Sequence, residues 1–405
     1  MRFLYNLAIQ LYGFIIFCIA PFNSKAKNWY LGRKNFNPIE LEPYKNGILI
    51  QASSLGEYEQ AKPLIDALRK KFPTKKIVLS FFSPSGFEAK KDLDIVDKVI
   101  YLPLDTPKKS KEFVDALEPE FAFFIKYDFW PNMYKTLSFS GSKIFLVSTI
   151  FREDQAFFKW YGAWYKDTLK YVEFFFVQNQ KSQELLKQIG FNNTSITGDT
   201  RFDQVLSIKS EPYSNSTIES FIEDSKLTIV GGSTWLEDEK LILNCIEQNN
   251  DCKWIIAPHE THSKHINTLV KLLEGESVVL YTQNPTKEKL SKADILIIDT
   301  IGILKYLYRY ANIAFIGGGF GKGIHNTLEP AVYGIPVLFG PNHKKFQEAQ
   351  DLLERKLAFE INQENVLDSF KHVRKSEKRA QIKTKSLEYI SEQKGAIDKI
   401  IEYLS

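Results

Sequence analysis

The sequence predicts an α/β protein made of two doubly wound domains, in which parallel strands are covered by helices on both faces. From Gly47 onward, short apolar runs alternate with amphipathic stretches, and this alternation stops once and then starts again. Continuous apolar strands separated by helices are typical of parallel sheets that are buried on both sides. A length of 405 residues also suits two domains better than one. Ligands are then expected at the carboxyl ends of the strands, in a cleft between the domains.

Six short runs, β-branched or aromatic and bounded by Pro, Gly or Ser, predict the strands of the first domain. They are GILIQA, KKIVLSFF, KVIYLPL, FAFFIKY, KIFLVST and FFFVQN. The stretches YEQAKPLIDALRKKF and QKSQELLKQIG are expected to form helices between them. The polar, aperiodic segment QVLSIKSEPYSNST then predicts a linker.

A second series of apolar runs follows the predicted linker. These runs are LTIVGGS, CKWIIAP, SVVLYT, DILIIDT, IAFIGGG and PVLFG. The expected division is an N-terminal membrane anchor at 1–35, a first domain at 36–205, a linker at 206–224, a second domain at 225–385 and a closing helix at 386–405.

The N-terminal segment is apolar and then basic. An apolar stretch runs from Leu7 to Phe22, which is shorter than the ~20 residues that a spanning helix needs. No small-residue cleavage site of a signal peptide follows it. Four basic residues lie between this apolar stretch and the first acidic residue, Glu40: Lys25, Lys27, Arg33 and Lys34. The pattern predicts a helix that lies in or dips into a membrane, with basic side chains at anionic headgroups and the rest of the chain in the cytoplasm.

The composition excludes several classes of protein. A hydrophobic content of 44% and a charged content of 25% are ordinary for a globular protein. A net charge of +4 is too small to indicate a nucleic-acid partner. Three cysteines form neither a disulfide framework nor a zinc pattern, which favours a reducing, cytosol-facing location.

The segment FIGGGFGKGIHNTLEPAVYGIPVLFGP, which begins at Phe315, predicts a site for an anion. It matches neither the P-loop pattern nor the dinucleotide fingerprint, because Lys322 is followed by glycine and itself occupies the position of a required glycine. What remains is a strand, a glycine turn and a helix start, whose N–H groups and dipole attract phosphate. A tight turn with no ligand is the alternative, and the polar residues His325, Asn326 and Glu329 favour a ligand.

The turn after the first predicted strand, QASSLGEYEQ, has two interpretations. Glu57 opens the following helix, where a glutamate is a common cap. It can instead face the cleft as a general base, and the helix dipole would then keep its carboxylate ionised at neutral pH. The sequence pattern does not decide between the two.

Three histidines follow a predicted strand in APHETHSKHI, at spacings of three residues. The metal-binding pattern HExxH is absent, since Ser263 stands where the second histidine belongs, and no metal is expected. His259 directly follows the strand and is better placed to contact a phosphate or a ribose.

Several of these motifs together resemble the 3-deoxy-D-manno-octulosonic acid (Kdo) transferases. They are GGGFGKGIHNTLEPAVYGIPVLFGP followed by HKKFQEA, ASSLGEYEQAKPLI and GDTRFD. The first motif is shared by many GT-B glycosyltransferases, whereas the other two narrow the resemblance to this family. The likeness runs nearly end to end and includes the N-terminal apolar segment.

The resemblance implies a GT-B fold with two Rossmann-like domains, and inverting transfer of Kdo from CMP-Kdo to the lipid A precursor lipid IVA. It also implies that no metal or cofactor is needed, that nucleic acid is not a partner, and that the enzyme acts at the cytoplasmic side of the inner membrane. The general base would be Glu57, assisted by Asp128 and Arg201. The family's CMP contacts map onto Pro258, His259, Ile301, Gly302, Ile303, Asn326, Thr327, Leu328 and Glu329. Further substrate contacts are expected at Ser53, Ser54, Gly56, Lys126, Ser233 and Lys322.

The chain departs from the family pattern at four places. It has His259 where the family usually has arginine, which removes a permanent cation that Lys264 or Lys322 can replace. It has Asp128 for glutamate and Arg201 for lysine, changes that keep the charge. It also has Ile301-Gly302-Ile303 for Met-Gly-Glu. Competing interpretations are a GT-B transferase that uses a UDP- or GDP-sugar, a sugar-nucleotide 2-epimerase, and an inactive membrane-associated binding protein.

Overall fold

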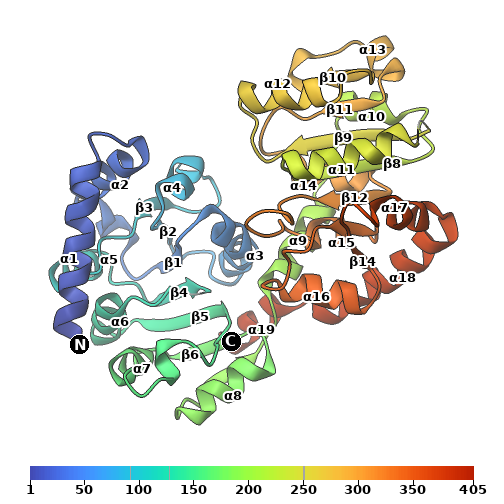
Figure 1. The fold of residues 1–405 in the computed structure, drawn as a ribbon. Coiled ribbons are helices and arrows are strands. Elements are labelled where there is room, and N and C mark those ends of the chain that lie inside the picture. The colour runs from blue at the N-terminus through green and yellow to red at the C-terminus, as the bar shows by residue number, and fades with distance from the viewer. Residues whose placement is uncertain (92, 127, 250) are drawn as a thin grey trace. The chain divides into compact units, whose positions relative to one another are not determined.

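The computed structural model describes residues 1–91, 93–126, 128–249 and 251–405, and it divides into two compact units (Figure 1). Unit 1 comprises Met1–Gln204 together with Gln393–Ser405, and unit 2 comprises Val205–Glu392. The segment expected to be a linker, 206–224, contains the end of helix α9 (Thr200–Ser210) and helix α10 (Ser216–Ile222).

Unit 1 contains a sheet with the strand order β3-β2-β1-β4-β5-β6-β7, and each recorded pairing within it is parallel. The chain order reverses between β1 and β4, so the switch point, where ligands bind in such sheets, lies between these two strands. The strands are β1 (Ile48–Ala52), β2 (Ile77–Phe81), β3 (Lys98–Tyr101), β4 (Phe121–Ile125), β5 (Lys143–Thr149), β6 (Phe174–Val177) and β7 (Thr194–Ile196).

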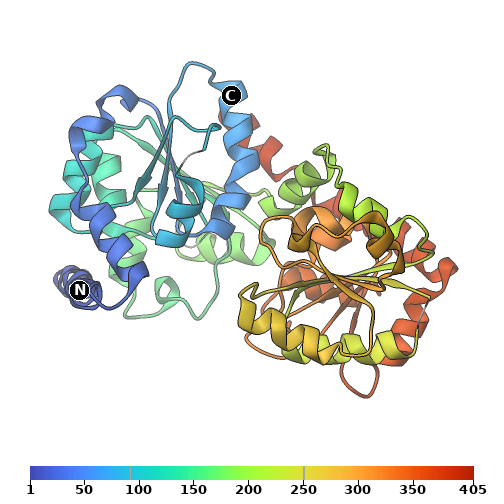
Figure 2. The same ribbon diagram turned by 90° about the horizontal axis from the view of Figure 1, so that it is seen from above.

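Helices cover both faces of this sheet, as Figure 2 shows. Alternate residues of β1 point to opposite faces: Ile48 and Ile50 pack into one apolar core, and Leu49 packs into the other. The helices are α3 (Leu55–Lys71), α4 (Pro84–Lys90), α5 (Pro107–Leu117), α6 (Pro131–Phe139), α7 (Ala163–Leu169) and α8 (Gln180–Gln188), with 3₁₀ turns at Pro38–Tyr44 and Ala156–Phe158.

Helix α3 shows why the chain folds locally as it does. The side chain of Ser54 accepts a hydrogen bond from the Glu57 N–H at 3.4 Å and caps the helix start. Arg69, Lys70 and Lys71 occupy its last turn, where cations stabilise the helix dipole. One stripe of the helix buries Tyr58, Ala61, Leu64, Ile65 and Leu68 against the sheet.

Unit 2 contains a second sheet, with the order β10-β11-β9-β8-β12-β13-β14 and parallel recorded pairings. Its switch point lies between β8 and β12. The strands are β8 (Thr228–Thr234), β9 (Lys253–Pro258), β10 (Val278–Leu280), β11 (Ile295–Ile297), β12 (Ile313–Ile316), β13 (Val337–Phe339) and β14 (Ala358–Glu360). The helices are α11 (Leu236–Glu247), α12 (Ser263–Leu272), α13 (Lys287–Lys292), α14 (Leu304–Leu307), α15 (Leu328–Ala331), α16 (Gln347–Glu354), α17 (Val366–Arg374) and α18 (Ser376–Gln393), with 3₁₀ turns at Tyr281–Gln283 and Tyr308–Tyr310. The predicted fold class, two doubly wound α/β domains, is confirmed.

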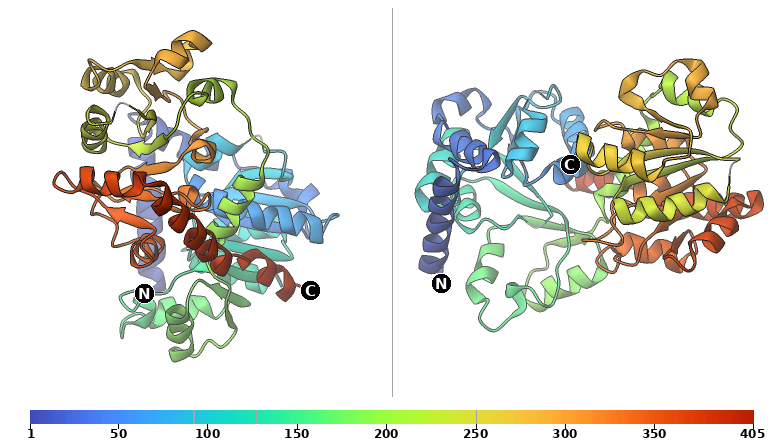
Figure 3. Two further views of the ribbon diagram at one scale, coloured as in Figure 1. Left: turned by 90° about the vertical axis from the view of Figure 1, so that its right-hand side faces the viewer. Right: turned by 45° about the horizontal axis from the view of Figure 1, so that its top comes forward.

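The last helix, α19 (Ala396–Tyr403), belongs to unit 1 and lies against α3 (Figure 3). Its residues Ile397 and Ile400 enter the same apolar core as α3. The connection to α19 is fixed by Asp203, whose carboxylate accepts hydrogen bonds from the N–H groups of Gly395 at 2.8 Å and Ile397 at 3.2 Å.

Two helices precede the first sheet: α1 (Arg2–Ile19) and α2 (Ser24–Lys34). No residue of α1 is buried, and among the described residues α1 is the one helix long and apolar enough to cross a membrane by length and composition. It is bonded to unit 1 by the Tyr5 hydroxyl, which donates to Asp105 at 2.7 Å, and by Asn6, whose amide oxygen accepts from Asn132 at 2.9 Å. Arg33, expected with the basic residues at headgroups, is only 7% exposed and does not project from the surface of α2.

Candidate active site

Polar side chains gather at the switch point of unit 1, at the carboxyl ends of β1 and β4. Gln51 is the second-last residue of strand β1, and Ser53 and Ser54 follow that strand directly. Lys126 and Asp128 follow β4. The structure therefore brings together residues that are separated by more than 70 positions in the chain, as the hydrogen bonds of Asp128 show.

Asp128 is held by side chains from the end of β1. The Ser53 hydroxyl lies 2.6 Å from one Asp128 carboxylate oxygen and 2.8 Å from the other, and Gln51 Nε2 donates to that carboxylate at 3.0 Å. Gln51 is in turn held by Ser80, whose hydroxyl donates to the Gln51 amide oxygen. Burial raises the pKa of Asp128 to about 6, although the hydrogen bonds from Ser53 and Gln51 lower it.

Glu57 lies beside Asp128 in the first turn of α3. Its Oε2 accepts a hydrogen bond from the Ser53 N–H at 2.5 Å. Burial and the negative charge of Asp128 raise the pKa of Glu57 to about 7, while the Ser53 hydrogen bond and the positive charge of Lys126 lower it. A pKa of about 7 leaves Glu57 only partly ionised at neutral pH, so the expectation of a fully charged carboxylate there needs correction. A carboxyl group of this pKa can both accept and hold a proton near pH 7.

Arg201 is positioned by Asp199. The guanidinium donates to Asp199 Oδ2 through Nε at 2.8 Å and through NH2 at 2.6 Å, and the Arg201 N–H donates to Oδ1 at 2.9 Å. Burial by itself raises the pKa of Asp199, but the charge and hydrogen bonds of Arg201 and the charge of Lys126 bring it below its usual range. Because the charge of Lys126 acts on both Asp199 and Glu57, the two carboxylates belong to one polar cluster.

Two residues of this cluster have left-handed backbones without being glycine. Lys126 has a φ of 61° and Ser148 a φ of 56°. Such conformations are costly outside glycine and gather at functional sites. Ser148 sits where the register between β5 and β6 shifts, and its hydroxyl receives a hydrogen bond from Gln178 at 3.0 Å.

The loops after β8 and β12 meet at the switch point of unit 2. Ser233 has a φ of 53° where the register between β8 and β9 shifts. A Cβ on Gly317 would lie 2.2 Å from the Ser233 carbonyl oxygen, so only glycine allows this approach of the two loops. The Asp238 carboxylate ties the loops together, since it accepts from the N–H groups of Trp235 and Gly318, each at 2.9 Å.

Three rings are stacked at this switch point. The ring of His259 lies 4.6 Å from Trp235 at 23° and 4.6 Å from His325 at 27°. Trp235 Nε1 faces His325 Nε2 at 3.5 Å, and because an indole nitrogen only donates, the proton of His325 lies on Nδ1. Burial and the neighbouring His259 lower the pKa of His325 to about 4, so this imidazole is neutral at pH 7.

The motif that follows, Asn326 to Glu329, forms a local network. Asn326 Nδ2 donates to Glu329 Oε1 at 3.1 Å, and Asn326 Oδ1 accepts from the Leu328 N–H at 3.1 Å. Thr327 and Leu328 are fully buried, so the substrate contacts predicted for them would have to use backbone groups. The helix expected to receive the phosphate, α15, has four residues, too few for a strong terminal dipole.

The remaining predicted contacts of unit 2 lie on other loops. Pro258 ends β9 and is buried, while Ile301 is 80% exposed beside Gly302, which has a φ of 97°. Ile303 precedes α14, and Lys322 is exposed on the glycine-rich loop. The other two histidines of the motif APHETHSKHI make separate pairs: His262 with Glu260 at 3.0 Å, and His265 with the buried Glu239 at 2.9 Å.

Four residues in these clusters are not predicted as site residues from the sequence: Gln51, Ser148, Asp199 and Trp235. Gln51, Ser148 and Trp235 are at or just beyond the carboxyl end of a predicted strand, and Asp199 lies within the motif GDTRFD. A polar residue at the end of an apolar strand is a signal for a site residue. The sequence does not show which residues it contacts, because its partners are distant in the chain.

Comparisons with known proteins show which family the chain is similar to. The family model for 3-deoxy-D-manno-octulosonic-acid transferase matches residues 27–204. The 3-deoxy-D-manno-octulosonic acid transferase of Rickettsia conorii is 25% identical, over 91% of this chain and 80% of its own length. The bifunctional glycosyltransferase/methyltransferase of Fusobacterium nucleatum is 28% identical over 87% of this chain, and the match spans 56% of that longer protein.

Solved structures support the fold alone. The UDP-GlcNAc 2-epimerase of Neisseria meningitidis aligns with a TM-score of 0.65 and 14% identity, over 88% of this chain and 99% of its own. MurG of Acinetobacter baumannii aligns with a TM-score of 0.54 and 13% identity, over 89% and 98%. The chain therefore has a GT-B fold and is similar to the Kdo transferases, which indicates a glycosyltransferase.

Proposed function

We propose that the protein transfers Kdo from CMP-Kdo to the lipid A precursor lipid IVA, with inversion and with Glu57 as general base. The observation that carries this proposal is the cluster of Glu57, Asp128 and Ser53 at the switch point of unit 1, in which the pKa of Glu57 is raised to about 7. The relatives that carry the name of Kdo transferase support the transferred sugar.

The proposed reaction is a single displacement. Glu57 takes the proton of an acceptor hydroxyl, the oxygen attacks C2 of Kdo, and the bond to the CMP phosphate breaks with its electrons on CMP. We expect the carboxylate of Glu57, whose Oε2 accepts a hydrogen bond from the Ser53 N–H, to receive this proton. The charge of Asp128 strengthens this base by raising its pKa.

Arg201 would stabilise negative charge as the donor bond breaks. Its guanidinium is fixed by two hydrogen bonds to Asp199, so little reorganisation is needed when charge develops. Asp128 assists as described above, and Lys126 adds positive charge to the same cluster.

We propose that unit 2 holds the CMP half of the donor. His325, neutral and protonated at Nδ1, can donate to a phosphate oxygen, and the stacked His259 lies beside it. Glu329, oriented by Asn326, can accept from ribose hydroxyls. In this arrangement side chains take over the role first expected of a helix terminus.

A lipid acceptor fits the N-terminal helix, which we propose lies in the plane of the cytoplasmic face of the inner membrane. The outer side of α1 exposes large apolar side chains, among them Leu7 at 52%, Leu11 at 55% and Phe14 at 61%. Its inner side is bonded to unit 1 through Tyr5 and Asn6. A helix bound to unit 1 along one side, with an apolar opposite side, suits a membrane surface better than a crossing.

Product mass tests the reaction. Purified protein is incubated with lipid IVA and CMP-Kdo, and the mass of the lipid product is measured by mass spectrometry. The expected result is that the lipid mass increases by one or more Kdo units while CMP is released. Parallel samples receive UDP- or GDP-sugars, and one receives UDP-GlcNAc for an epimerase assay. Activity only in these samples would replace the proposal with one of its alternatives.

Fractionation tests the membrane location. Leu11→Ser with Phe14→Ser should move the protein from the membrane fraction to the soluble fraction, because it removes apolar surface from the outer side of α1. Ile39→Ser with Val270→Ser, which changes exposed apolar residues elsewhere, is the matched control and should leave the distribution as it is. Equal distributions for the two variants would contradict the anchor.

A further inference from the structure

A second polar region of unit 1 lies apart from the cluster around Glu57. It is a cavity of about 710 Å³ between α1, α2 and the start of α5. Within the described residues its lining contains four cationic side chains and no acidic one: Arg33, Lys34, Lys108 and Lys109. Such a concentration of one sign of charge around a cavity attracts an anion.

Arg33 is the most unusual of these cations, because it is 7% exposed and forms no ion pair among the described residues. Its NH1 and NH2 groups donate to the carbonyls of Trp29 at 3.2 Å and Phe82 at 2.8 Å, and its Nε has no partner within the same part of the chain. The guanidinium lies 4.0 Å from the centre of the Trp29 ring. Burying a cation without a countercharge costs free energy, because the charge loses its hydration. A bound anion would offset this cost.

The beginning of α5 adds to the positive potential. Pro107 occupies the first turn of this 11-residue helix, and the Thr106 hydroxyl caps the Lys109 N–H at 3.3 Å. Helix N-termini stabilise anions. The pairing of Lys108 with Glu112, at 3.8 Å, offsets little of this charge, because Lys108 is largely exposed there.

The cavity borders the apolar side of α1. Gln10 and Gly13 of α1 line it, as does Tyr30, whose ring lies 5.2 Å from that of Phe17. A ligand that joins an anionic group to an apolar chain could place the anion among the cations of the cavity and the chain against the apolar side of α1. We propose that the cavity between α1, α2 and α5 is a binding site for the phosphate group of a lipid. The proposal rests on the membrane location proposed above.

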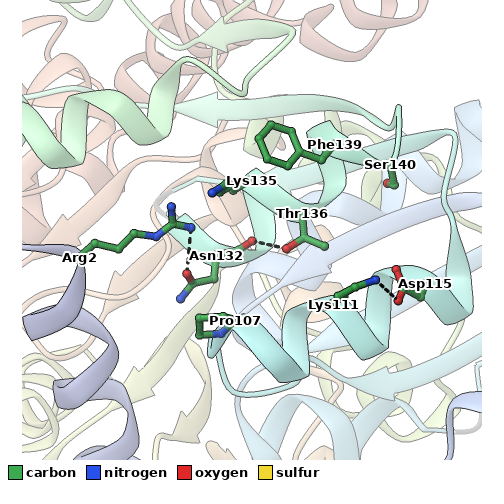
Figure 4. A pocket seen from close by; sticks show the side chains of 9 residues that line it. All are labelled: Arg2, Pro107, Lys111, Asp115, Asn132, Lys135, Thr136, Phe139 and Ser140. Carbon is green, nitrogen blue, oxygen red and sulfur yellow. Dashed lines mark hydrogen bonds and ion pairs between the residues drawn. The ribbon is translucent and has the colours of Figure 1, made fainter.

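A smaller cavity at the other end of α1 provides a contrast. It has a volume of about 320 Å³ and also contains cations, and two of them, Arg2 and Lys111, have partners among the residues drawn in Figure 4. Lys111 forms an ion pair with Asp115 at 2.5 Å, and Arg2 donates to Asn132 at 3.2 Å. The larger cavity differs in that its lining includes a buried arginine, Arg33, with no ion pair among the described residues.

Vesicle flotation of the full-length protein tests the site. Vesicles of phosphatidylcholine are compared with vesicles that also contain phosphatidic acid, which carries a phosphate monoester. Lys34→Gln with Lys109→Gln should lower the preference for phosphatidic acid by about thirtyfold, since each basic residue near such a surface contributes about 1 kcal/mol and ~1.4 kcal/mol is tenfold in affinity. The control, Lys70→Gln with Lys143→Gln, removes the same charge from exposed positions outside the cavity and should keep the preference. Equal losses in both variants would mean diffuse attraction and would overturn the site.

A second measurement separates a lipid phosphate from free phosphate. Short-chain phosphatidic acid below its micelle concentration should raise the thermal midpoint of the wild type and not that of Lys34→Gln with Lys109→Gln, whereas inorganic phosphate at the same concentration should have a smaller effect. An equal effect of inorganic phosphate, or an unchanged response in the cavity variant, would overturn the proposal. Neither measurement uses CMP-Kdo, so its failure leaves the proposed Kdo transfer to be judged by product mass.

Discussion

The two switch points share a topology and differ in chemistry. In unit 1 the loops after the two central strands carry carboxylates, with Glu57 and Asp128 side by side and Arg201 fixed by Asp199. In unit 2 the equivalent loops carry glycines and three stacked rings, in which Trp235, His259 and His325 take part. The same doubly wound frame therefore presents carboxylates and an arginine in one unit and stacked aromatic rings in the other, because the loops and not the sheet carry the chemical differences.

The largest expected effect comes from Glu57→Gln. Glutamine keeps the shape of the side chain but accepts no proton, so turnover should fall by about 10²–10⁴-fold, the usual contribution of a general base. The thermal midpoint should change little, as for the loss of ~1 kcal/mol at a cap. Glu59→Gln, on the same helix and paired with Lys90 at 3.4 Å, is the matched control. A Glu57→Gln enzyme with the wild-type rate would leave Glu57 as a cap only.

The unit 2 counterpart is Glu329→Ala, which should weaken CMP binding without unfolding the protein. A hydrogen bond to a charged group contributes about 1.5–3 kcal/mol, which corresponds to roughly tenfold to a hundredfold in affinity. Calorimetric titration with CMP measures this, and Glu364→Ala, at an exposed position of unit 2, is the control. An unchanged dissociation constant would place the nucleotide elsewhere.

The pH dependence of the rate tests how the two carboxylates of unit 1 act on each other. Since burial and Asp128 raise the pKa of Glu57 to about 7, the ionised base is lost as pH falls, and kcat/KM should fall about tenfold per pH unit well below pH 7. Asp128→Asn removes the charge that raises this pKa and should move the midpoint to lower pH. Asp115→Asn, an exposed carboxylate of the same unit, should not move it. Identical midpoints in all three proteins would contradict the coupling.

The smallest expected effect concerns stability. Glu57 has a folded pKa above that of an unfolded glutamate, so its contribution to the free energy of unfolding is present below about pH 4.5 and is lost as pH rises towards 7. Glu57→Gln should therefore flatten the fall of the thermal midpoint between these pH values. Glu59→Gln should retain the wild-type slope, and an equal slope in the two variants would show that Glu57 does not titrate in this window.

The sequence predicted most of the fold, and the two strands it missed share a cause. β7 (Thr194–Ile196) and β14 (Ala358–Glu360) are three residues long, stand at the edge of their sheets and are not fully buried. Such strands need no apolar run, so no periodicity marks them. The central strands, buried throughout, were all marked by apolar runs.

Parts of the site were also within reach of sequence reasoning. Glu57 and Asp128 stand in short motifs, and the structure joins them through Ser53. Asp199 and Trp235 act through partners brought together by folding, and the raised pKa of Glu57 depends on burial that the local sequence does not encode. At α15 the sequence predicted more than the structure contains. The motif predicted a helix whose dipole binds phosphate, but α15 has four residues, too few for a strong terminal dipole.

The place of α19 has a consequence for how the protein is made. Unit 2 is an insertion between the two parts of unit 1, so the chain leaves unit 1 at Gln204 and returns at Gln393. While the ribosome is still translating unit 2, the core beside α3 lacks Ile397 and Ile400. Unit 2 can complete its fold on emergence, whereas unit 1 must wait for the last residues of the chain with apolar surface uncovered. The unit that carries Glu57 is thus the last to be finished during biosynthesis.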